Sequence, residues 1–61
     1  MKEQVPVTVI DDAGNQVFQN LMIVNSKTKE NAIHIFELNR NRNPNMFPEV
    51  VEYPLHVRIG N

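Results

Sequence analysis

The chain has 61 residues, 41% of them hydrophobic, with six basic and seven acidic side chains and a net charge of −1. This length predicts a single small domain, 1–61, which folding alone leaves with about 40% of its unfolded surface exposed. The near-zero net charge excludes the overall attraction that nucleic-acid binders use. Absence of cysteine excludes disulfides and thiolate zinc sites, so we expect no metal, no cofactor and stabilisation by homo-oligomerisation.

The N-terminal segment 1–6 lacks the apolar region of a secretory signal. Elsewhere the chain has no run near the ~20 apolar residues that cross a bilayer. We therefore expect a cytoplasmic protein with no membrane partner, and the lack of cysteine fits a reducing compartment.

Residues 5–10 are rich in β-branched side chains and predict a strand, with Pro6 near its start or on a sheet edge. The segment Asp11–Asn15 predicts a hairpin turn. In it, Gly14 supplies the positive φ of a type I turn with a G1 bulge.

A three-residue loop at 12–14 sets the register of the second strand, which runs from Gln16 to Val24. Ile10 then lies opposite Gln16, and Val9 opposite Val17. Because side chains alternate along a strand, this register places Val17, Leu21 and Ile23 on the same face as Val7 and Val9. Phe18 and Met22 fall on the other face.

Residues 32–38 are ambiguous between strand and helix. The apolar positions make no clean helical stripe and include Ile33, Ile35 and Phe36, so we interpret the segment as a strand. The alternative is a helix over 28–40, capped by Ser26 or Thr28 and ending before Pro44.

A polar stretch, about 39–48, predicts a flexible connection of the length that binding loops often have. The last element, Val50–Ile59, alternates well and predicts a half-buried strand. The sequence therefore predicts an all-β fold, a small antiparallel sheet of about four strands completed by oligomerisation. The α+β alternative is ββαβ with residues 28–40 helical.

The Asn-Arg run at 39–45 is the candidate binding site for a partner. Guanidinium groups suit carboxylate or phosphate, and amides read base edges or cap the chain locally. The adjoining Met46 and Phe47 would supply an apolar anchor. The proposed partner-binding residues are Arg40, Asn41, Arg42, Asn43, Met46 and Phe47.

Apolar side chains on both predicted faces of the sheet indicate a contact between copies of the chain. The predicted oligomer interface comprises Phe18, Met22, Val24, Tyr53 and Leu55. No catalytic constellation is apparent, because Ser26 is the single serine and Asp11 and Asp12 suit a turn. We therefore expect no enzyme.

Three functional hypotheses follow. The first is a self-associating accessory or regulatory module, of the kind that phages and plasmids often encode, which docks on a protein through an edge strand and the Asn-Arg run. The second is an oligomer that binds nucleic acid through Arg40 and Arg42, with strong salt dependence. The third is a purely structural subunit.

Overall fold

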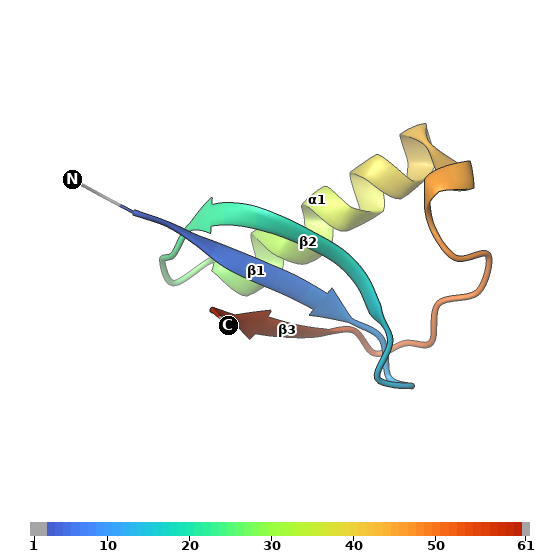
Figure 1. Cartoon of the computed structure of the whole chain (residues 1–61), viewed down its shortest axis with the longest axis horizontal. Helices are drawn as coiled ribbons and strands as arrows, with labels where there is room; N and C mark the ends of the chain where they lie inside the picture. Colours follow the sequence, from blue (N-terminus) through green and yellow to red (C-terminus); the bar gives the residue numbers. More distant parts are fainter. Residues whose placement is uncertain (1–2, 61) are drawn as a thin grey trace.

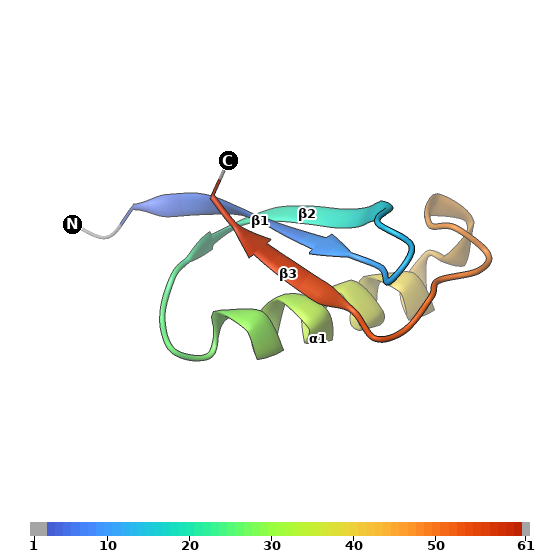
Figure 2. The ribbon, with the colours of Figure 1, turned by 90° about the horizontal axis from the view of Figure 1, so that it is seen from below.

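The computed structural model describes residues 3–60 as a three-stranded antiparallel sheet with one long helix (Figure 1). The elements, in chain order, are β1 (Gln4–Ile10), β2 (Gln16–Ile23), α1 (Thr28–Arg42), the short 3-10 helix η1 (Pro44–Met46) and β3 (His56–Ile59). The strand order is β2-β1-β3. The helix lies along one face of the sheet and leaves the other without a covering layer (Figure 2).

The prediction of an all-β fold is wrong. Residues 32–38 lie inside α1, so the protein is an α+β domain in which the helix occupies the segment that the ββαβ alternative assigned to it. One side chain in each four-residue step is buried, at Thr28, Ala32 and Phe36. This narrow ridge is enough to cover a three-stranded sheet, although it is too narrow to dominate the sequence pattern.

The start of α1 is fixed by a side-chain turn between Asn25 and Thr28. The Asn25 Oδ1 atom accepts the Lys27 N–H at 2.8 Å, and the Thr28 hydroxyl accepts the Asn25 N–H at 2.7 Å while donating to the Asn25 carbonyl at 2.9 Å. Thr28 is itself buried. The turn before the helix is thereby anchored in the core. This anchoring compensates for the low helix propensity of the several asparagines in α1.

The core lies between α1 and the sheet. Its buried apolar side chains are Val7, Val9, Val17, Ala32 and Phe36. The rings of three phenylalanines pack together in this core. Their centroids are 6.1 Å apart for Phe18–Phe36 and for Phe18–Phe47, and 5.6 Å apart for Phe36–Phe47. These spacings are typical of favourable tilted and edge-to-face aromatic pairs.

The hairpin turn is confirmed. The Asp11 N–H donates to the Asn15 carbonyl at 2.9 Å, the Gly14 N–H donates to the Asp11 carbonyl at 3.0 Å, and Gly14 has a φ of 90°. A left-handed conformation at this position favours glycine, since it costs other L-residues roughly 1–2 kcal/mol.

Replacement of Gly14 by alanine should therefore lower the free energy of unfolding by about 1 kcal/mol. No atom lies within 4 Å of the added Cβ, so the cost comes from the backbone alone. Urea unfolding followed by circular dichroism measures it. Gly14→Asn is the matched control and should lose less, because asparagine tolerates the left-handed region. Equal stability of Gly14→Ala and the wild type would contradict the assignment.

A β-bulge at Val17 makes the predicted register wrong beyond the turn. Ile10 pairs with Gln16 as expected, but Val9 pairs with Phe18, so β2 contains one extra residue. Because a one-residue shift reverses the facing of every later side chain, Phe18 and Met22 face α1. Leu21 and Ile23 face away from it.

The strand predicted from Val50 is also shorter than expected, since β3 begins only at His56. Residues 47–55 are irregular and cross over the hairpin turn, where the Asp12 N–H donates to the Glu52 carbonyl at 2.9 Å. Pro48 and Pro54 lack the N–H groups that a continuous ladder needs. The alternating pattern instead serves packing, because Val51 and Leu55 contact the core from this segment.

Candidate binding surfaces

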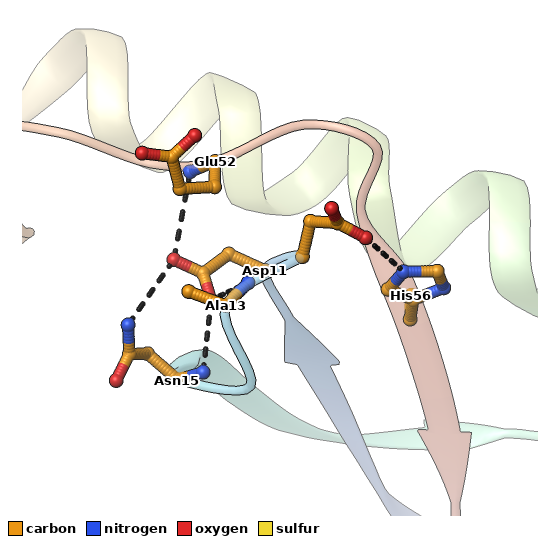
Figure 3. A network of polar contacts seen from close by, with 6 residues as sticks. Asp11, Ala13, Asn15, Glu52 and His56 are labelled. Carbon is orange, nitrogen blue, oxygen red and sulfur yellow. Dashed lines mark hydrogen bonds and ion pairs between the residues drawn. The ribbon is translucent and has the colours of Figure 1, made fainter.

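The Asp11 carboxylate is the centre of the largest polar network (Figure 3). Only 3% of the residue is exposed. Its Oδ1 atom accepts the backbone N–H groups of Asn15 at 2.8 Å and Ala13 at 3.1 Å, and its Oδ2 atom accepts the Asn15 side-chain amide at 3.4 Å and the Glu52 N–H at 3.5 Å.

These donors have an electrostatic consequence. The Asn15 backbone N–H lowers the pKa of Asp11 most strongly, and the other donors assist it against the opposing effect of burial. A carboxylate held ionised by the backbone of its own turn is suited to fastening the turn to residue 52, and it is not poised for proton transfer. Sequence analysis correctly placed Asp11 in a turn but missed its contact with Glu52.

The neighbouring Asp12 contacts His56 with an Oδ1–Nε2 distance of 3.2 Å, and both side chains are more than half exposed. An exposed pair of this kind contributes at most about 1 kcal/mol. No cluster of three or more His, Asp or Glu side chains that would hold a metal ion occurs within residues 3–60.

The Asn-Arg run is helical and not a loop. Arg40, Asn41 and Arg42 form the last turn of α1, and Asn43 caps the helix by donating its N–H to the Asn39 carbonyl at 2.9 Å. The predicted connection 39–48 therefore begins with helix and continues into η1. The two arginines also stabilise the helix, because cations interact favourably with the negative end of the helix dipole. This is a structural role.

The two arginines differ in their availability. The Arg40 guanidinium donates to the Glu49 carbonyl at 3.1 Å and so fastens the segment after η1 to the helix. Arg42 is exposed and makes no hydrogen bond or ion pair to the described part of the chain. Arg42 is thus the member of the pair that is available to a partner.

The two predicted apolar anchors, Met46 and Phe47, also differ in their exposure. Met46 is 79% exposed at the end of η1, whereas Phe47 packs against Phe18 and Phe36. Four exposed residues follow one another closely at the end of α1 and in η1, and we call them the helix-end patch: Asn41, Arg42, Asn43 and Met46.

The predicted oligomer-interface residues separate into two groups. Phe18, Met22 and Leu55 pack against the protomer's own core and are half-buried there. Val24 and Tyr53 are 43% and 55% exposed. The inward position of Phe18 and Met22 follows from the bulge at Val17, which no motif in the sequence announces.

The uncovered side of the sheet, which we call the open face, was missed by sequence analysis. Leu21 and Ile23 are 56% and 44% exposed on it, while Pro6 and Ile10 are half-buried. Strand pairing places these described side chains on the open face: Pro6, Thr8, Ile10, Gln19, Leu21, Ile23, His56 and Arg58.

The outer edge of β2 borders this face. Here the Leu21 N–H donates to the side-chain oxygen of the preceding Asn20 at 3.0 Å. A shallow hollow beside it is lined by Pro6, Gln19, Asn20 and Leu21. The side-chain cap occupies a donor that another strand would need, so it discourages pairing along this edge.

Comparisons with protein-family models, curated proteins and solved structures found no match. Neither helix within residues 3–60 has the length and apolar character needed to cross a membrane.

Proposed function

We propose that the chain is a non-enzymatic accessory module that associates with itself and docks on a protein partner. The observation that carries the proposal is the one-sided sheet: α1 covers one face, and the other face carries exposed Leu21 and Ile23. Contiguous apolar surface next to polar groups is typical of protein-interaction sites. The cysteine-free composition suits a cytoplasmic location.

The docking role rests on the helix-end patch. The exposed guanidinium of Arg42 offers a charge-assisted contact and the exposed Met46, four residues on, offers an adaptable apolar contact, which suits an acidic protein segment with an apolar side chain. The outer edge of β3 is a further unpaired strand edge. Nucleic-acid binding is less well supported, because Arg40 is engaged by Glu49 and the net charge is −1.

Arg42→Ala should weaken binding of a fluorescent glutamate-rich peptide that carries a central leucine by roughly two- to fivefold, the value of one exposed ion pair. Anisotropy titrations measure this, with a single-stranded oligonucleotide as the competing probe. Lys29→Ala is the matched control, since Lys29 is an exposed cation in the first turn of α1.

An equal loss of peptide affinity in the two variants would show that only the total charge matters. It would contradict binding at the helix-end patch. Tighter, steeply salt-dependent binding of the oligonucleotide would favour the nucleic-acid function instead. No binding of either probe by a chain that still self-associates would leave the structural-subunit function.

A further inference from the structure

The open face is ordered in rows that cross the three strands. Gln19, Thr8 and Arg58 form the central row, because Thr8 pairs with Gln19 on β2 and with Arg58 on β3. Leu21 and Pro6 form the next row, which ends at Gly60, whose N–H donates to the Pro6 carbonyl at 2.8 Å. Every row is therefore centred on β1.

The middle of the central row holds an unsatisfied polar group. Thr8 is 1% exposed, and its Oγ1 atom has no hydrogen-bond partner among residues 3–60. Buried hydroxyls are normally paired, because an unpaired one loses its bonds to water without replacement. The unsatisfied hydroxyl thus lies beneath the centre of the open face, closed off by the protomer's own side chains, with the half-buried Pro6 and Ile10 on either side of it along β1.

The surface area supports a missing contact. The chain exposes 4628 Å², whereas a compact monomer of its mass exposes about 4,100 Å². If each copy buried the excess of about 500 Å², the two would bury about 1,000 Å², the lower bound for a specific interface. This area fits a weak dimer of the chain.

We infer that two copies pack their open faces together about a twofold axis that runs along β1. The inference rests on the self-association in the proposed function and names its surface. Such an axis places β2 of one copy over β3 of the other, and sheets packed in this way cross at roughly 30°. It brings Gln19 over the partner copy's arginine at position 58 and Leu21 over glycine 60.

Charge selects this axis over the alternative. The open face carries Arg58 and His56, and the His56 ring contacts the Asp12 carboxylate at the end of this face. An axis across the strands would stack β3 on β3 and bring the Arg58 guanidinium groups of the two copies together. With the axis along β1, each Arg58 instead meets the amide oxygen of Gln19, a neutral acceptor.

Sedimentation velocity at loading concentrations from about 5 to about 500 µM tests the dimer. We expect the wild type to dimerise with a dissociation constant on the order of 10–100 µM, because the interface is small. Leu21→Lys should raise that constant at least about tenfold. Met46→Lys is the matched control and should leave it unchanged, since Met46 is exposed in η1, away from the sheet.

Gln19→Glu gives the sharper test. A glutamate opposite Arg58 at two symmetric places should tighten the dimer about fivefold, and Gln19→Lys should weaken it by a similar factor. Circular dichroism of each variant checks that the protomer is intact. In a dimer joined edge to edge through β2, the two copies of Gln19 lie close together, so Gln19→Glu would weaken it.

Dimerisation that Leu21→Lys leaves unchanged, or that Gln19→Glu weakens, would overturn the open-face dimer while the proposed self-association stands. A wild type that stays monomeric at every concentration would overturn both. The evidence for docking on a protein would then come from the Arg42→Ala titration alone.

Discussion

Phe36→Ala should remove a large part of the protein's free energy of unfolding. Phe36 is fully buried and touches both other phenylalanines of the core. Removing a buried phenylalanine side chain costs about 3–5 kcal/mol. A domain of this length has a total stability of roughly 3–9 kcal/mol, so the loss amounts to at least about a third of it and unfolds the protein at the lower end of that range.

Urea unfolding monitored by circular dichroism and by proton NMR dispersion measures the effect. Leu38→Ala on the same helix is the control, because Leu38 is 42% exposed and should cost well under half as much. Phe36→Leu should retain much of the stability by filling the same space. Similar stabilities for Phe36→Ala and Leu38→Ala would show that α1 does not pack on the sheet through this ridge.

Asp11→Asn should give the second large loss of stability, a fall of roughly 5–15 °C in the melting temperature at neutral pH. The substitution keeps one acceptor oxygen but replaces the other with a donor. The N–H of Glu52 and the amide of Asn15 would then face another donor, so the hairpin turn would separate from segment 47–55. Asp12→Asn is the control, because the Asp12 side chain is exposed and contacts only His56.

The same contact makes stability depend on pH. The folded-state pKa of Asp11 lies below its unfolded value of 3.8, so its contribution is fully present above that value. It is lost as the pH falls through the folded-state pKa. The melting-temperature difference between the wild type and Asp11→Asn should therefore be largest near neutral pH and shrink below about pH 4. A difference that is constant between pH 7 and pH 2.5 would contradict this role.

The first half of the fold was predictable because its signals are local. The β-branched run of β1 and the aspartate and glycine of the turn each specify their own backbone conformation. The bulge at Val17 was not predictable in this way. It lets both Val17 and Phe18 pack into the core beneath α1, and that packing involves a helix that lies far along the chain.

Helix α1 was hard to predict for a related reason. Its buried ridge has a single residue at each step, and Ile33 and Ile35 also favour a strand. The helix prevails because a three-stranded sheet needs a cover on at least one face, which is a property of the whole domain. The turn between Asn25 and Thr28 was the local signal that favoured a helix.

The binding surfaces were only partly predictable. The exposed Arg42 and Met46 come from the run that the sequence singled out, whereas Arg40 and Phe47 serve the protomer itself. The open face could not be predicted, since its membership depends on the bulge and on the position of α1. Alternation along β2 assigned Leu21 and Ile23 to the core, and the extra residue reverses them.

The pairing of β1 with β3 also determines how the domain bears mechanical load. The chain enters the sheet at Gln4 and leaves it at Ile59 along neighbouring antiparallel strands, which are joined there by the bond from Gly60 to Pro6. Tension applied between these ends acts on one end of a ladder of four residue pairs, from Val7–Ile59 to Ile10–His56. The pairs then open one after another, each at a cost of about 1 kcal/mol, and are never sheared together. The domain therefore yields by peeling β3 away from β1, at a lower force than a sheet loaded in shear would bear.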